Sequence, residues 1–195
     1  LLKMIQFAGY FLKLNNNSLN YTKLLKLMYV ADKEALKNWD ETISGDYYFN
    51  LPQGPILSKV LDLIKGSGDN FEQCEWDINF YKTDYILKLK SKMSFDELTA
   101  AEIELLKLID EKFKKYSWNK MIEYVHNNKL FPEWENPGEN SRLPLPIEKI
   151  LKAYQCNVDI VTGEVGKVPK NADIKKAFQK NPKIKSVFFQ AHETS

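Results

Sequence analysis

The side chains most often used for catalysis or metal binding are scarce and scattered in this chain. Only two histidines occur among its 195 residues, His126 and His192, and its two cysteines are Cys74 and Cys156. A zinc site or a redox pair needs such ligands at short spacing, as in CxxC, and the sequence has no such pair. His126 instead ends an expected helix, where capping the last carbonyls is the commoner role. The cysteines are expected as buried or free thiols of a reducing compartment.

A group of carboxylates near the end of a second expected helix could bind a cation or act as acid and base. The group comprises Asp32, Glu34, Asp40, Glu41 and Asp46. The alternative is a solvated rim plus one Asp that is hydrogen-bonded to local backbone. We favour this second interpretation.

Sequence motifs of common enzyme classes are absent from the chain. No GxGxxG, GxxxxGK[ST], HExxH or GxSxG pattern occurs. Gly66-Ser67-Gly68 follows an expected helix rather than a strand, so we interpret it as a turn and not as a phosphate cradle. We therefore expect no enzymatic activity, no cofactor and no metal.

Composition and charge indicate an ordinary globular chain. Hydrophobic residues make up 44%, and 28 Lys plus Arg oppose 26 Asp plus Glu, for a net charge of +2. This balance excludes a wholly disordered or collagen-like protein and gives no reason to expect membrane or nucleic-acid binding. The apolar runs are far shorter than the ~18 residues that span a bilayer. No signal peptide is visible, so we expect a cytoplasmic location.

Hydrophobic periodicity predicts mainly α-helix. Asn20 is the expected N-cap of the second helix, and Pro55 suits the first turn of the third because its missing N–H would be unpaired there. Thr99 and Glu102 form a capping box. The six expected helices begin near residues 1, 20, 55, 99, 117 and 146.

The only strand signal before the C-terminal region is the alternation of apolar residues over 74–90, around Lys82-Thr83-Asp84, which predicts a β-hairpin. The fold class is thus mainly α (α+β): a helical bundle of about six helices with a small antiparallel β-hairpin and a lysine-rich C-terminal extension. We place the globular domain at residues 1–156 and the basic extension at 157–195.

The extension differs in composition from the rest of the chain. Between Val165 and Gln190 it holds seven lysines and one acidic residue, Asp173. Residues 174–178 are expected to form a short helix and 187–189 a strand. The lysines could contact RNA phosphates, but few aromatic residues are interleaved with them, so a solvated face or a surface for an acidic protein is favoured.

Several motifs, in a fixed order, resemble those of a known family. The segments are KLLKLMYVAD at 23–32, SGDYYF at 44–49 and QGPILS at 53–58, followed by His126, PEW at 132–134, PI at 146–147 and IL at 150–151. This series is similar to the SocA-like antitoxin domain, also called Panacea. In that family a KLLxLxYxAD-type helix precedes an aromatic segment and a GPV-like turn that opens the next helix. The resemblance covers roughly residues 1–155, and Gln53 stands where many relatives carry His.

The resemblance implies an antitoxin of a two-gene toxin–antitoxin system, often carried by prophages or mobile elements. Such an antitoxin neutralises its cognate toxin by direct protein–protein binding. One branch of the family instead acts as a proteolytic adaptor that delivers the toxin to a cellular protease, which would add a protease subunit as a partner. A small enzyme, or an RNA-binding protein acting through the basic extension, remains a competing hypothesis.

Two sets of residues follow from the motifs and the composition. The family-motif residues expected to serve structure are Leu24, Tyr29, Asp32, Gly45, Gly54, Pro55, His126 and Trp134. The expected partner contacts are Tyr47, Tyr48, Phe49 and Gln53 in an aromatic loop, and Lys175, Lys176 and Phe178 in the extension. A loop braced by Pro and Gly presents rings at low entropy cost. The alternative interpretation is that Tyr47 and Phe49 fill the bundle while Gly54-Pro55 sets the angle of the helix.

Overall fold

A computed structural model of the chain describes residues 1–161, 169–184 and 187. The helices are α1 (Leu2–Leu14), α2 (Tyr21–Trp39), α3 (Ser58–Lys65), α4 (Asn70–Asn79), α5 (Ala100–Phe113), α6 (Trp118–Val125), α7 (Ile147–Ala153) and α8 (Asn171–Lys180). The strands are β1 (Ser18–Asn20), β2 (Tyr48–Leu51), β3 (Gly54–Leu57), β4 (Phe80–Thr83), β5 (Ile86–Leu89) and β6 (Leu143–Leu145).

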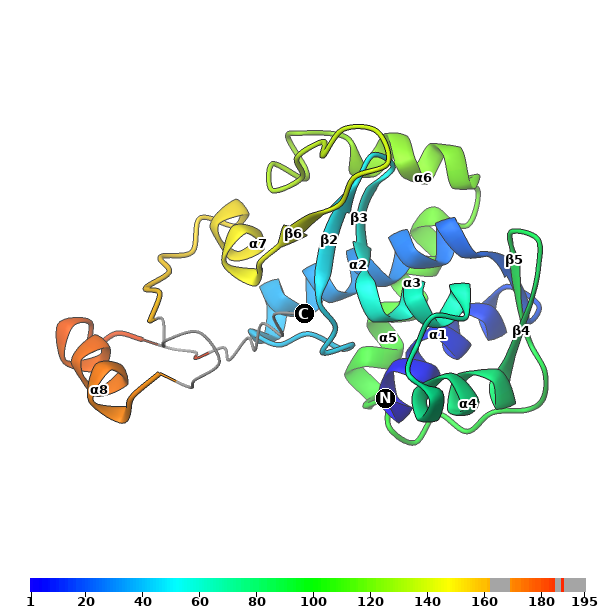
Figure 1. Ribbon diagram of the computed structural model, residues 1–195, viewed down its shortest axis with the longest axis horizontal. Helices are drawn as coiled ribbons and strands as arrows, with labels where there is room; N and C mark the ends of the chain where they lie inside the picture. Colours follow the sequence, from blue (N-terminus) through cyan, green and yellow to red (C-terminus); the bar gives the residue numbers. More distant parts are fainter. Residues whose placement is uncertain (162–168, 185–186, 188–195) are drawn as a thin grey trace.

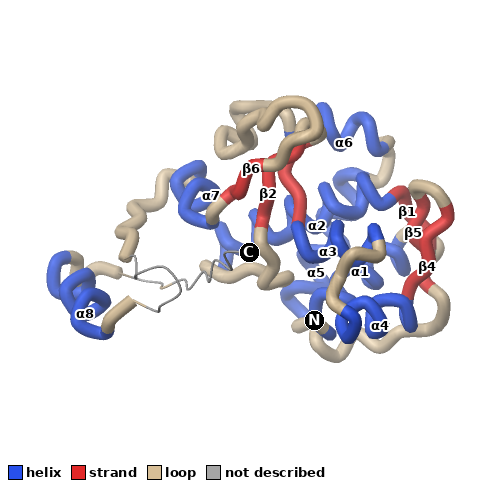
Figure 2. Tube along the Cα trace, in the orientation of Figure 1, coloured by secondary structure: helices blue, strands red, loops and turns tan. Residues whose placement is uncertain are grey.

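The predicted class, helices with small antiparallel sheets, is confirmed, but the inventory is richer than expected. The described residues form eight helices rather than about six, and two three-stranded sheets rather than one hairpin. Figure 2 shows the two sheets on either side of α2 and α3.

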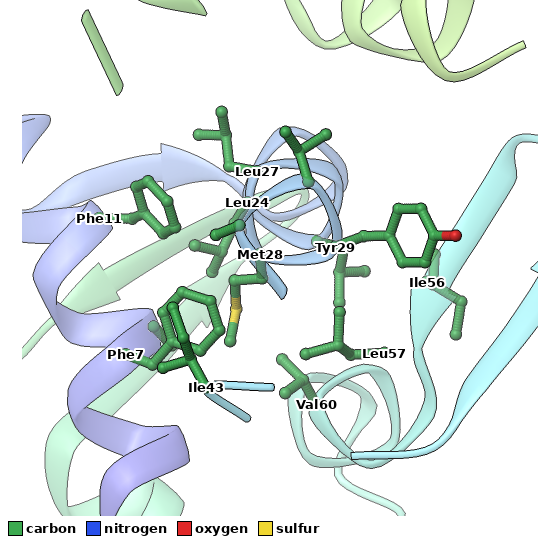
Figure 3. Close-up of a cluster of buried hydrophobic side chains, with 14 of the residues drawn as sticks. Phe7, Phe11, Leu24, Leu27, Met28, Tyr29, Ile43, Ile56, Leu57 and Val60 are labelled. Atoms are coloured by element: carbon green, nitrogen blue, oxygen red, sulfur yellow. The ribbon is translucent and has the colours of Figure 1, made fainter. Parts of the chain in front are cut away.

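Helix α2 is the centre of the molecule. Its predicted cap is confirmed, since the Asn20 side chain accepts hydrogen bonds from the amides of Thr22 and Lys23. In Figure 3, Phe7 and Phe11 of α1 pack on one side of α2, while Tyr29 points the other way, towards β3. The buried hydrophobic core extends from Met4 to Leu151 and so includes α1 and α7.

The first sheet contains the predicted hairpin in shortened form. Strands β4 and β5 pair antiparallel, and β1 adds to β5 in the order β1-β5-β4. The expected strand over 74–79 is wrong, because these residues belong to α4. Trp76 and Phe80 are four residues apart and pack ring on ring at 4.4 Å, whereas Ile78 is 65% exposed. The alternation therefore marked a contact between Trp76 of α4 and Phe80, which follows the helix, and not a strand over 74–79.

The second sheet, β3-β2-β6, replaces the start of the third expected helix. Pro55 lies in β3 opposite Asn50, and the helix begins only at Ser58. Proline is tolerated in edge strands, where a ladder donor is not needed, and both edges of this sheet carry one, Pro55 and Pro144. Strand β6 lies between the PEW segment and α7, and its residues Leu143–Leu145 pair with Tyr48–Asn50 of β2.

The remaining helices follow their sequence signals. The capping box of Thr99 and Glu102 is present at α5, Ser117 caps α6, and α7 follows Pro146. Helix α8 includes the predicted helix at 174–178, buries no residue, and stands apart from the rest in Figure 1. No helix in the described ranges is long and apolar enough to cross a bilayer.

The helices and strands above leave two expectations for the extension undecided: the strand at 187–189 and the boundary at residue 156. Val187 has no strand assignment, and Phe188 and Phe189 lie outside the described residues. The domain boundary at residue 156 stays a prediction.

Candidate functional site

Polar side chains on the buried faces of α2 connect this helix to distant segments. Lys23, Lys26, Asp32 and Lys33 are only 1–6% exposed. A buried charge is costly unless it is paired or hydrogen-bonded, and each of these side chains has a partner far along the chain. Helix α2 therefore positions the segments that surround it as well as filling the core.

Asp32 holds the segment that leads into β2. Its Oδ1 accepts hydrogen bonds from the amides of Ile43 at 2.8 Å and Ser44 at 3.0 Å, and its Oδ2 accepts from the hydroxyls of Ser44 and Tyr48. Burial raises the pKa of Asp32 to about 6, although these hydrogen bonds oppose the shift. Asp32 is thus one carboxylate of the sequence group that bonds to backbone, and it is fully buried.

Asp46 caps helix α3 from outside that helix. The residue before α3, Leu57, has no capping side chain, and the carboxylate of Asp46 accepts from the amides of Lys59 at 3.0 Å and Val60 at 3.1 Å. It also accepts from the amide of Tyr47. Burial raises the pKa of Asp46 to about 6. Gly45 beside it is exposed, with φ +62°, a conformation that glycine adopts freely.

A buried ion pair joins α2 to the PEW segment. Lys33 Nζ lies 2.6 Å from Glu133 Oε1, and the Tyr29 hydroxyl donates to the same oxygen at 2.9 Å. Lys33 also donates to the Leu130 carbonyl and lies over the ring of Phe131. Burial lowers the pKa of Lys33 and raises that of Tyr29. This contact therefore joins two segments of the chain that are 100 residues apart in sequence.

The tip of the β2–β3 hairpin is clamped by α2 and α6. Lys26 Nζ donates to the Pro55 carbonyl at 2.9 Å. Gly54 has φ +101°, and a Cβ at this position would lie 2.5 Å from a methyl carbon of Val125. Only glycine therefore fits here, both for its backbone conformation and for the close approach of α6.

His126 and Trp134 stack beside this hairpin, with ring centroids 4.1 Å apart and planes inclined by 15°. The indole of Trp134 donates to the Leu51 carbonyl, and the imidazole of His126 hydrogen-bonds the Pro52 backbone. Burial lowers the pKa of His126, and within the described part of the chain its Nε2 has no partner. His126 is thus a packing residue. As expected, it also ends α6, where its backbone N–H donates to the Ile122 carbonyl.

A pocket of about 460 Å³ is lined by residues of the hairpin, α2 and α3, among others. Its apolar wall comes from α2, the hairpin and α3, and its aromatic residues come from α2, the β4–β5 turn and the start of α6. Its polar side chains include Gln53, the buried Lys26 and the exposed Lys65. We call it the hairpin pocket. Its lining residues include Tyr21, Lys26, Leu51, Gln53, Lys65, Tyr85 and Trp118.

The structure does not gather the expected partner contacts into one surface. Gln53 lines the hairpin pocket, Tyr47 is 37% exposed, and Phe49 is half-buried under the guanidinium of Arg142. Tyr48 is only 3% exposed and bonded to Asp32, so it has no surface for a partner; it faces inwards because alternate residues of β2 point to the core. The extension's contacts, Lys175, Lys176 and Phe178, are exposed on α8.

The expected structural residues are buried or half-buried, and Gly45 is the exposed exception. Leu24, Tyr29, Asp32, Gly54 and Pro55 are buried, and His126 and Trp134 are half-buried.

Sequence reasoning missed the lysines and the glutamate of the internal network. Lys26 and Lys33 are seven residues apart with Tyr29 between them at helical spacing, so all three lie on one face. That spacing was a usable signal, because a lysine on an apolar face implies a buried acceptor. No signal located Glu133 as a partner.

The described residues contain no group of three or more His, Cys, Asp or Glu side chains arranged to hold a metal ion. Cys74 and Cys156 are free and exposed. The structure therefore combines an internally bonded frame with an aromatic-rimmed pocket.

Comparison with known proteins gives one match. Residues 24–135, more than half of the chain, match the sequence model of the family described as antitoxin SocA-like, Panacea domain. The matched range begins in α2 and ends just after Trp134, so it contains both halves of the Lys33–Glu133 contact. No curated protein and no solved structure matches the chain.

Proposed function

The chain belongs to the SocA-like antitoxin family that carries the Panacea domain, and from that premise we propose that it neutralises a cognate toxin by direct protein–protein binding in the cytoplasm. The family match over residues 24–135 is the observation that carries the proposal. Neutralisation by binding requires a stable folded surface that is present at least at the toxin's concentration.

The use of side chains in the fold supports a binding role. Charged residues of and beside the family motifs are engaged in internal contacts, as at Asp32 and at the Lys33–Glu133 pair. Large aromatic rings are left at the surface, including Tyr47, Tyr85 and Trp118, which are 37%, 65% and 42% exposed. Exposed Tyr and Trp on a rigid scaffold are typical of binding hot spots.

Binding rather than catalysis is part of the same proposal, and stoichiometry tests it. We expect relief of toxicity only when this chain is at least equimolar with the toxin. Full relief at a large molar excess of toxin would instead favour an enzyme that acts on the toxin's product or target.

The test is growth of a bacterial host that expresses the neighbouring reading frame with and without this chain. We expect growth arrest from the neighbour alone, relief by this chain, and co-purification of the two proteins. Arrest that this chain does not relieve would contradict the proposal. The toxin's abundance separates two mechanisms: a stable toxin indicates occlusion, whereas a short-lived one indicates delivery to a protease.

A further inference from the structure

The hairpin pocket carries positive charge without a compensating carboxylate. Lys26 and Lys65 line it, and no Asp or Glu is among its lining residues, all of which lie in the described part of the chain. Asp62 and Asp84 adjoin lining residues in sequence but do not line the pocket. A third cation lies close by: Lys82 Nζ is 6.0 Å from the ring centroid of Tyr21, which lines the pocket.

Lys26 has unused hydrogen-bonding capacity. A lysine ammonium has three N–H donors, and in the described structure Lys26 Nζ donates to the Pro55 carbonyl. Its side chain is 1% exposed, so water has little access to the remaining donors. Burial lowers the pKa of Lys26 to about 7, which reflects the cost of holding an ammonium there without a counter-charge. A carboxylate entering the pocket would remove that cost.

The rest of the lining suits an apolar group next to such a carboxylate. Tyr21 and Tyr85 stack with centroids 5.8 Å apart, and Trp118 is 42% exposed at the start of α6. Leu51 adds an aliphatic wall. The volume of about 460 Å³ lies within the ~300–1,000 Å³ of typical ligand sites.

We propose that the hairpin pocket is the anchor point for the toxin, and that it receives a short toxin segment in which an acidic residue lies next to an aromatic or aliphatic one. The carboxylate binds at the exposed Lys65, while the buried Lys26 adds positive charge to the pocket, and the apolar side chain packs against Trp118 and the tyrosine pair. This inference rests on the proposed function, because it takes the occupant to be the toxin.

The first arm of the test examines the chemistry of the pocket without the toxin. The probes are 3-phenylpropionate, which joins a ring to a carboxylate, and 3-phenylpropionamide, the same ring without charge. Chemical shifts of the Trp118 indole N–H and the Gln53 amide report binding. We expect the carboxylate to bind at least tenfold more tightly than the amide, and Lys65→Glu to abolish this preference. Lys107→Glu, the same charge change on the exposed face of α5, is the matched control.

The second arm uses the toxin identified by the growth assay. We expect Lys65→Glu and Trp118→Ala each to weaken toxin binding at least tenfold. The controls Lys107→Glu and Leu108→Ala, on exposed positions of α5, should bind as the wild type does. Lys26 is left unchanged because it also holds the hairpin. Circular dichroism melting of every variant excludes loss of fold as the cause.

The outcomes separate the inference from the function. Equal binding of the carboxylate and the amide, or toxin binding unchanged in both pocket variants, overturns the pocket assignment and leaves the antitoxin function standing. A wild-type chain that neither binds the toxin nor relieves arrest overturns the function, and the toxin-anchor assignment with it.

Discussion

Single buried polar residues fix the geometry around α2. Three buried side chains of α2, those of Asp32, Lys26 and Lys33, each have a hydrogen-bond partner in another segment. Each therefore connects the helix to a different part of the chain. Breaking one such connection leaves a buried polar group unsatisfied, which is usually worth about 1–3 kcal/mol or more.

We predict that Asp32 makes stability fall as pH rises from about 4 to about 6. Its folded-state pKa is about 6, above the ~3.9 of an unfolded aspartate, so the folded chain binds more protons in this interval. The contribution is fully present below the unfolded pKa and is lost as pH rises through the folded one, about 3 kcal/mol in all. Urea unfolding at several pH values measures it.

Asp32→Asn is the reference for this measurement, because the amide keeps the shape of the side chain but does not titrate. The difference in unfolding free energy between wild type and variant should shrink or change sign across the interval. Because burial shifts Asp46 in the same direction, only the difference isolates Asp32. Identical pH profiles for the two proteins would refute the assignment.

Gly54→Ala is predicted to destabilise the protein by about 2–5 kcal/mol, the sum of a left-handed backbone cost and overpacking. Its φ is +101°, and the new methyl would meet Val125 at 2.5 Å. Gly45→Ala is the matched control, since Gly45 also has positive φ but nothing within 4 Å of an added Cβ. It should lose only the backbone part, about 1–2 kcal/mol. Equal losses at both sites would show that α6 yields to the methyl group.

At the scale of elements, the two sheets and the helix layer depend on contacts between segments distant in sequence. Strand β6 pairs with β2, and β1 pairs with β5, so neither outer strand forms from local sequence alone. Proline at both edges of the β3-β2-β6 sheet limits further strand addition there. Helix α3 likewise owes its N-terminal cap to a residue twelve positions before it begins, Asp46.

Removing this remote cap should destabilise α3. Asp46→Ala leaves the amides of Lys59 and Val60 without their acceptor, and we expect a loss of about 1–2 kcal/mol in unfolding free energy. Asp46→Asn keeps one acceptor oxygen and should lose less. Hydrogen exchange of the Lys59 and Val60 amides gives a local measurement. Unchanged protection of both amides in the alanine variant would contradict the capping role.

At the scale of the whole molecule, the hydrophobic core lies within the first four-fifths of the chain. The core runs from Met4 to Leu151, and α8 buries no residue, as its position in Figures 1 and 2 illustrates. The family match is narrower still, at residues 24–135, although α1 packs directly on α2. The stable unit is therefore larger than the matched range.

Deleting residues 162–195 should leave stability unchanged within about 0.5 kcal/mol, as for surface changes remote from the core. Thermal unfolding of the shortened and full chains measures this directly. Toxin binding by the shortened chain then tests the proposed contacts at Lys175, Lys176 and Phe178. A large drop in melting temperature would show that the extension packs on the core.

The sequence alone determined the elements whose signals are local. The Asn20 cap, the Thr99–Glu102 capping box, the β4–β5 turn and the helix at 174–178 each depend on neighbouring residues, and the motif series already pointed to the family. Caps and turns depend on the chemistry of neighbouring residues, so the amino-acid sequence alone is enough to predict them.

Only the tertiary structure decided which residues are buried together and where a pocket lies. Pro55 reads locally as a helix start, yet strand pairing with β2 placed it in a sheet, and Tyr48 reads as a surface ring although alternation along β2 turned it inwards. Lys26 and Lys65 line one pocket because the hairpin, α3 and α6 converge there from separate parts of the chain. Long-range packing outweighs local preference wherever burial of side chains supplies more free energy than the local signal.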